Sequence, residues 1–197
     1  MKRIATGATA FACGGVVAML LYFVPGSQSA VPVTVTTNLP AAATATHPMW
    51  TETKWPFLMD QWGEGKAFQC KAADCGVELT LYIRSKIGLC SSTIGVADDS
   101  ELERLSYFDF MNGATVALGE GHEINVAWMK GRTRAYTIAG PRRSRTTAMS
   151  FAYNSNSDAL VATVILNDAP PAAIEPAVVE FLNGQPMLRW VSSSLGL

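Results

Sequence analysis

Histidine is scarce in this chain, and the residue patterns of common catalytic sites are missing. His47 and His122 are the only histidines among 197 residues, so a serine nucleophile in the C-terminal part would have only His122 as its base. Gly-x-Ser-x-Gly, Gly-rich phosphate-loop and His-Glu-x-x-His patterns are also absent. These absences argue against the common hydrolase, nucleotide-binding and zinc-protease classes. We expect no catalytic residue, no metal and no cofactor.

Charge is nearly absent from the first fifty residues. The opening MKR carries two cations and precedes an uncharged stretch, 4–24, which ends in the apolar run VVAMLLYFV. About 20 apolar residues cross a bilayer as a helix, and cations before them favour a cytoplasmic N-terminus. We therefore predict a retained single-pass membrane anchor over residues 1–24. The alternative is a signal peptide that is cleaved near the small residues at 27–30.

The next segment, 25–49, has no Asp, Glu, Lys or Arg and consists largely of Ala, Thr, Val, Pro and Ser. It has too few large apolar side chains to form a core, so we predict a flexible linker that spans about 25–30 Å. Within it, VPVTVTT at 31–37 alternates weakly and is a candidate edge strand. The folded domain is then 50–197, outside the membrane that the anchor crosses. In a cell with two membranes, it would be a periplasmic domain on the inner membrane, or a soluble periplasmic protein if the anchor is cleaved.

Three of the four cysteines lie close together, at Cys70, Cys75 and Cys90. An extracytoplasmic compartment is oxidising, so disulfides are expected. Cys70 and Cys75 flank a four-residue connection between two strand-like runs, which puts them within disulfide reach. Pairing of either with Cys90 fits the sequence equally well. The alternative function is thiol-redox or metal chemistry at these three cysteines, although Cys-x4-Cys differs from the Cys-x-x-Cys of oxidoreductases.

Hydrophobic periodicity in residues 50–197 predicts an α+β domain. The clearest strand is Val77–Arg84, whose odd-numbered residues are apolar and whose even-numbered residues are polar, which predicts one buried and one wet face. Lys130-Gly131 predicts the tip of a hairpin, and Ser100 with Glu103 has the spacing of a helix capping box. We predict an antiparallel sheet of short strands with two short helices, preceded by the transmembrane helix and the linker. The expected strands are 66–69, 77–84, 115–118, 122–129, 133–139, 147–152, 160–166 and 187–191, and the expected helices are 100–109 and 172–182.

Large aromatic residues crowd the start of the domain, at Trp50, Trp55, Phe57 and Trp62. Such side chains gain most by burial, so we expect a lid over the core. If they are exposed, they would suit a lipid interface or a partner protein. The three tryptophans are therefore binding candidates.

Acidic and basic residues are segregated in the second half of the chain. Residues 98–123 carry seven acids and one base, whereas 130–145 carry six bases and no acid. An ordinary solvated surface would explain this segregation. Because arginine dominates the basic segment, the alternative is an anion-binding surface for lipid headgroups, phosphorylated surface polymers or an acidic partner. The arginine candidates are Arg132, Arg134, Arg142, Arg143 and Arg145.

The combination of anchor, uncharged linker, segregated charge and missing catalytic patterns favours a non-enzymatic protein. We expect a membrane-tethered extracytoplasmic binding or accessory domain. Its partners would be the membrane, reached through the N-terminal helix, and a membrane or envelope protein. Nucleic acid is not expected as a partner.

Overall fold

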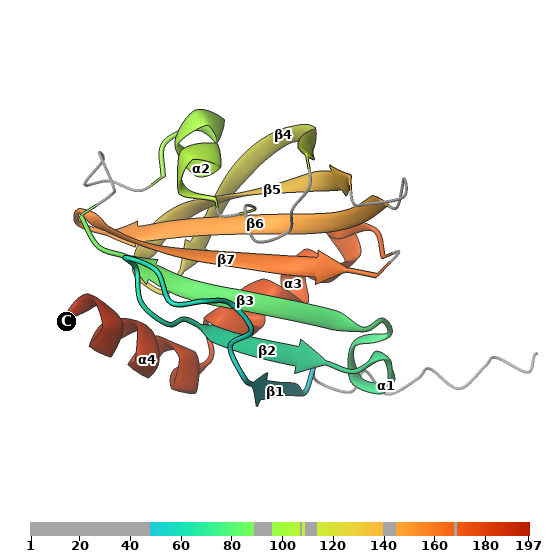
Figure 1. Cartoon of the computed structure of the whole chain (residues 1–197), viewed down its shortest axis with the longest axis horizontal. Coiled ribbons are helices and arrows are strands. Elements are labelled where there is room, and N and C mark those ends of the chain that lie inside the picture. The colour runs from blue at the N-terminus through green and yellow to red at the C-terminus, as the bar shows by residue number, and fades with distance from the viewer. Residues whose placement is uncertain (1–47, 89–95, 107, 109–113, 140–144, 168) are drawn as a thin grey trace, which may run out of the picture. The chain divides into compact units, whose positions relative to one another are not determined.

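Seven antiparallel strands form one sheet in the part of the chain that the computed structural model describes, in the order β1-β2-β3-β7-β6-β5-β4 (Figure 1). The described residues are 48–88, 96–106, 108, 114–139, 145–167 and 169–197. The strands are β1 (Trp50–Thr53), β2 (Lys66–Cys70), β3 (Leu79–Lys86), β4 (Ala114–Val126), β5 (Met129–Ala139), β6 (Arg145–Ser155) and β7 (Asp158–Leu166). The helices are α1 (Ala72–Cys75), α2 (Asp99–Leu105), α3 (Pro171–Leu182) and α4 (Gln185–Leu195).

Several predictions fall outside these residues. The anchor at 1–24, the linker except its last two residues, and the candidate strand at 31–37 are among them, as are Cys90, Arg142 and Arg143. Within the described ranges, no helix is long and apolar enough to cross a membrane.

The antiparallel sheet is confirmed, but its details differ from the prediction. The strands from β4 to β7 are longer than expected, and the described chain has four short helices rather than two. The predicted final strand, 187–191, is wrong because this segment belongs to α4. Met187 and Val191 are both buried and lie four residues apart, which is the spacing of one helix face. A short apolar run is compatible with the periodicity of a strand or of a helix, and here the segment forms a helix.

One face of the sheet, which we call the helix face, packs against α3 and α4 and contains the main core (Figure 1). Leu79, Leu81 and Ile83 of β3 point into it and are fully buried, as their alternation predicted. The buried members of this core are Phe68, Cys70, Leu79, Leu81, Ile83, Ile124, Val126, Met129, Met149, Phe151, Tyr153, Leu160, Ala162, Val164, Leu166, Ala169, Ile174, Val178, Leu182, Met187 and Val191.

The opposite face, which we call the α2 face, is also covered in part, so the predicted wet side of β3 is wrong at Arg84, whereas Glu78 is exposed and Thr80 and Tyr82 are half-buried. Arg84 and Lys86 are each only 4% exposed. Arg84 donates to Asp60 in the segment between β1 and β2, and Lys86 Nζ donates to the Leu105 carbonyl at the end of α2. A smaller apolar cluster joins α2 to the sheet and contains Val96, Leu102, Leu105, Ala152, Ala159 and Val161.

The hairpin between β4 and β5 turns earlier than the sequence predicted. Its two-residue tip is Ala127-Trp128, because Val126 pairs with Met129. Lys130 and Gly131 lie within β5. The sequence also predicted separate strands at 115–118 and 122–129. Residues 114–126 instead form the single strand β4, and Gly119-Glu120-Gly121 forms a bulge in it between Leu118 and His122.

Helix α2 begins at Asp99 rather than at Ser100, so the predicted capping box is wrong. Asp98 is the N-cap residue, and its Oδ1 accepts a hydrogen bond of 2.8 Å from the Glu101 N–H. The Glu101 carboxylate reaches back to the Ala97 N–H at 2.8 Å. A similar exchange of bonds therefore occurs two residues before the predicted position, with the carboxylate bonded to the Ala97 N–H rather than to that of the N-cap residue.

Candidate functional site

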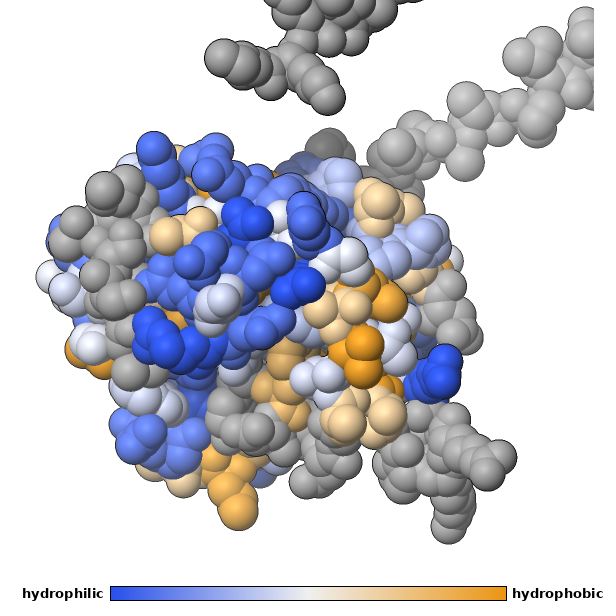
Figure 2. Space-filling view, turned by 90° about the horizontal axis from the view of Figure 1, so that it is seen from above, coloured by the Kyte–Doolittle hydropathy of each residue, from blue (hydrophilic) through white to orange (hydrophobic). Residues whose placement is uncertain are grey.

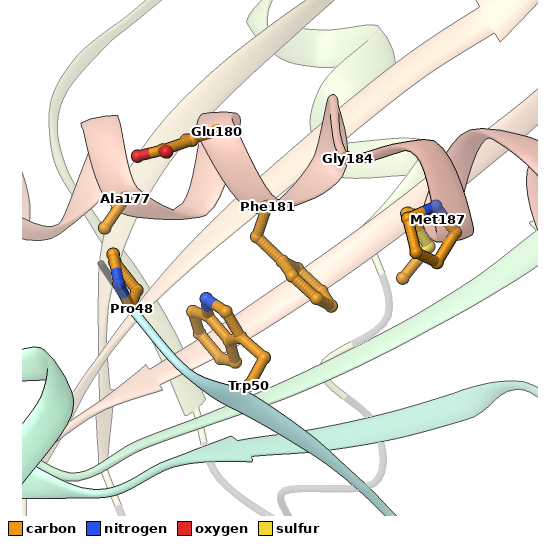
Figure 3. Close-up of a pocket in the computed structure, with 8 residues that line it drawn as sticks. Pro48, Trp50, Ala177, Glu180, Phe181, Gly184 and Met187 are labelled. Atoms are coloured by element: carbon orange, nitrogen blue, oxygen red, sulfur yellow. The ribbon is translucent and has the colours of Figure 1, made fainter. Parts of the chain in front are cut away.

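A pocket of about 290 Å³ lies between the edge strand β1 and the corner where α3 meets α4 (Figure 3). The strand side supplies Pro48 and Trp50, and the helix side supplies the other walls. We call this feature the β1–α3 groove. Its lining residues are Pro48, Trp50, Ala177, Glu180, Phe181, Gly184, Pro186 and Met187.

Two stacked aromatic rings hold the walls of the groove in place. Figure 3 shows Trp50 and Phe181 facing each other from β1 and α3. Their ring centroids are 4.8 Å apart and their planes differ by 28°. Phe181 also meets Phe68 of β2 edge to face, with centroids 4.9 Å apart. Such pairs each contribute about 0.5–1.5 kcal/mol beyond area burial, so the groove is preformed rather than collapsed.

The polar groups of the groove are few. Trp50 Nε1 is buried and has no hydrogen-bond partner among the described residues. A buried donor without a partner is costly, so this N–H is a strained feature of the groove wall rather than an accessible donor. Glu180 adds one carboxylate to the lining. The site can therefore take an apolar group and has little capacity for acid or base chemistry.

Strand β1 borders the groove and lies at the edge of the described sheet, where it pairs only with β2. In an antiparallel ladder alternate residues direct both backbone groups to one side. Half of the N–H and C=O groups of β1 therefore point away from β2. A bare edge of this kind is a template for another extended segment.

The other predicted tryptophans lie away from this groove. Trp55 is 7% exposed and packs edge to face on Phe57 and Tyr82, with centroids 5.1 and 6.1 Å away. It therefore acts as the predicted lid, but over the α2 face. Trp62 is half-buried, and its backbone N–H donates to Asp60 Oδ1 at 2.8 Å.

The arginine candidates within β5 are paired with the acidic segment. Arg132 Nε donates to Asp99 Oδ1 at 2.5 Å, and Arg134 Nη1 donates to Glu103 Oε1 at 2.7 Å. The Gly121 N–H, at 3.0 Å, and the Arg132 guanidinium hold the pKa of Asp99 below its usual range. The segregated charges thus meet across the α2 face. Arg145 is exposed at the start of β6.

Cys70 and Cys75 form a disulfide with their Cα atoms 6.0 Å apart. This is one of the pairings that the sequence allowed. The four residues predicted as a simple connection mostly form the single turn α1, which sits between β2 and β3. Cys70 is fully buried, so the disulfide crosslinks a hairpin and its Cys70 sulfur is not exposed for reaction.

The histidine of the domain lies on the surface. His122 is 57% exposed, and its Nε2 is 2.7 Å from Glu175 Oε1 of α3. A carboxylate partner is present, but this degree of exposure is unlike that of a deep catalytic pocket. Among the described residues, no group of three or more His, Cys, Asp or Glu side chains could hold a metal ion.

Sequence reasoning selected Trp50 but missed the helix side of its groove. Ala177 and Phe181 are four residues apart and share a face of α3 that differs from its buried face of Ile174, Val178 and Leu182. This second apolar stripe could have been recognised in the sequence. The strand that faces it could not have been predicted from the local sequence, because Trp50 lies far from α3 along the chain.

Comparison with known proteins gives no family for this chain. No protein-family model matches it, and no curated protein matches it. The function must therefore be argued from the groove and its surroundings.

Proposed function

We propose that this chain is a membrane-tethered extracytoplasmic binding protein, without enzymatic activity, that captures an extended segment of a membrane or envelope protein in the β1–α3 groove. The anchor at 1–24 and the linker at 25–49 hold the domain near the membrane. The groove supplies the recognition.

The observation that supports this proposal is the position of the pocket directly beside the edge of β1. Strand addition uses these two features together. The backbone groups of an edge strand give affinity, and a neighbouring pocket selects one side chain of the added segment. In this chain Trp50 belongs to both features, since it lies in β1 and lines the pocket.

The chemistry of the lining defines the segment that fits. Trp50, Phe181, Pro186 and Met187 favour one large apolar side chain. Glu180 favours a cationic side chain nearby rather than an acidic one. The affinity need not be high, because a tether of this length raises the effective concentration of a neighbour to about the millimolar range.

The arginines of β5 play no part in this proposal. Asp99 and Glu103 already compensate the charges of Arg132 and Arg134. An anion would have to displace these carboxylates, which makes the predicted anion-binding surface weaker at β5 than the sequence suggested.

Blocking the groove tests the proposal. The full-length protein in detergent is used to select binders from a displayed library of short random peptides, and selected peptides are assayed by fluorescence anisotropy. Ala177→Trp fills the groove, whereas the matched control Ala173→Trp adds the same side chain at an exposed position of α3. We expect enrichment of peptides with a large apolar residue, at least about 10-fold weaker binding to A177W, and unchanged binding to A173W. Equal binding to both variants, or no enrichment, would reject the groove as the site.

A further inference from the structure

The second sheet edge carries an exposed apolar strand segment. Strand β4 is outermost and pairs only with β5 within the described sheet. Its first five residues, 114–118, read ATVAL and carry no charge. Val116 is 63% exposed and Leu118 is 45% exposed, both on the helix face. Figure 2 looks onto the side where Figure 1 places α2 and β4, and it shows apolar surface beside a larger hydrophilic area.

The rest of β4 is protected in ways that 114–118 is not. Beyond Leu118, β4 has its bulge, which contains Glu120, and then Glu123. Bulges and charges are the usual devices that keep edge strands from pairing. The opposite edge, β1, is only four residues long and is the edge to which the proposed function assigns a peptide. Within the described part of β4, residues 114–118 are therefore the unprotected segment.

We propose that two copies of this chain pair edge to edge through residues 114–118. In an antiparallel pairing centred on Val116, Val116 faces its own copy, Thr115 faces Ala117 and Ala114 faces Leu118. All five residues of each copy then have an apolar or hydroxyl partner, and the bulge stays outside the interface. The segment is thus complementary to itself, as a twofold interface requires.

This pairing is compatible with the rest of the fold. Directly opposite residues of an antiparallel pair lie on the same face of the sheet, so the twofold axis is perpendicular to the sheet. Helices α3 and α4 of both copies then lie on one side. Because β1 and β4 are opposite edges, the two β1–α3 grooves would remain open at the outer ends. The dimer does not depend on the proposed function, but it would make peptide capture bivalent.

The interface is small, so its detection needs a method that traps weak pairs. Cross-strand pairs each contribute about 0.2–1 kcal/mol, and opposed residues have Cβ atoms about 4.5–5.5 Å apart. A cysteine on the twofold axis would therefore be within disulfide reach of its copy. Two copies anchored in one membrane also meet at a raised effective concentration.

The first test is Val116→Cys in the full chain, with Cys13 and Cys90 changed to Ser so that the Cys70–Cys75 bond remains. The matched control is Thr51→Cys, an exposed position on the opposite edge strand. In native membranes under mild oxidation we expect V116C to give a crosslinked dimer at least about 10-fold faster than T51C. Equal rates, or no dimer from V116C, would overturn the proposal.

A charge exchange at the same position separates loss of pairing from loss of folding. Like charges that face each other across a strand pair destabilise it, and opposite charges stabilise it. After chemical crosslinking in native membranes, which traps weak pairs, we expect differently tagged V116K chains not to copurify with each other, and V116K to copurify with V116E. Copurification of V116K with itself at the wild-type level would show that another surface holds the copies together and would overturn the proposal. Failure of the V116K and V116E pair to associate would overturn it as well.

Discussion

Asp99 of α2 accepts a hydrogen bond of 2.5 Å from Arg132 of β5, and this contact joins the acidic segment of the chain to the basic one. The Asp99 carboxylate also lies 3.4 Å from Arg134 Nη1 and accepts from the Gly121 N–H at 3.0 Å. One side chain thus ties α2 to β5 and to the bulge of β4. The charge pattern that the sequence suggested for binding serves here to fix α2 on the sheet.

Replacing Asp99 by Asn tests this role. The substitution keeps the shape of the side chain but removes its charge, so Arg132 and Arg134 lose their shared carboxylate. We expect the free energy of unfolding in urea to fall by about 1–3 kcal/mol. The control is Glu103→Gln, whose carboxylate is 53% exposed, and we expect a loss of at most about 1 kcal/mol. A larger loss in E103Q than in D99N would contradict the assignment.

Acid should weaken the domain through the same carboxylate and through Asp60. The pKa of Asp60 lies below its ordinary value of 3.8, chiefly because Arg84 donates to it, and the pKa of Asp99 is lowered as well. A folded pKa below the unfolded one gives stability that is fully present above the unfolded value and is lost as the pH falls through the folded value. Urea unfolding across a pH series should therefore show a decline below about pH 4. The D60N/D99N double variant should be less stable at neutral pH and show a shallower acid decline, and an unchanged decline would refute this account.

Reduction of the Cys70–Cys75 disulfide should have a modest effect. The bond closes a loop of only six residues, with a sequence separation of five, and such a loop gives about 2 kcal/mol through the unfolded chain. Urea unfolding with and without reductant measures this difference, in a variant with Cys13 and Cys90 changed to Ser. Peptide mapping of the unreduced native chain should recover Cys70 joined to Cys75. Recovery of Cys90 joined to either one would show that the assigned pairing is wrong.

The parts of the fold that the sequence predicted are those with a local signal. Leu79, Leu81 and Ile83 alternate with polar residues and are fully buried, and α3 ends at Leu182, as the predicted helix 172–182 does. The burial of Arg84 could not be predicted in this way. It depends on Asp60, which the segment between β1 and β2 brings across the strand.

Gly131 shows why the hairpin tip was misplaced. Glycine marks either a turn or a place where another chain segment comes very close. Gly131 pairs with Tyr153, and a Cβ atom at Gly131 would lie only 2.5 Å from the Tyr153 Cβ. Tyr153 belongs to β6, so a pattern in the sequence around Gly131 does not predict this contact. The real tip, Ala127-Trp128, contains no residue typical of a tight turn.

Ala127 therefore offers a test of the hairpin. Its φ of 52° lies in the left-handed region, which costs a residue with a Cβ atom about 1–2 kcal/mol and glycine little. Its N–H donates to Asn183 Oδ1 at 2.7 Å, a bond that glycine would keep. Glycine also increases the conformational entropy of the unfolded chain, which offsets part of this gain. We therefore expect Ala127→Gly to raise the free energy of unfolding by about 0.5–1 kcal/mol. The matched control Ala135→Gly, in the middle of β5, should lower it by a similar amount, because glycine weakens a strand interior. Urea unfolding of both variants measures the two signs, and a loss of stability in A127G would mean that the tip does not lie at Ala127-Trp128.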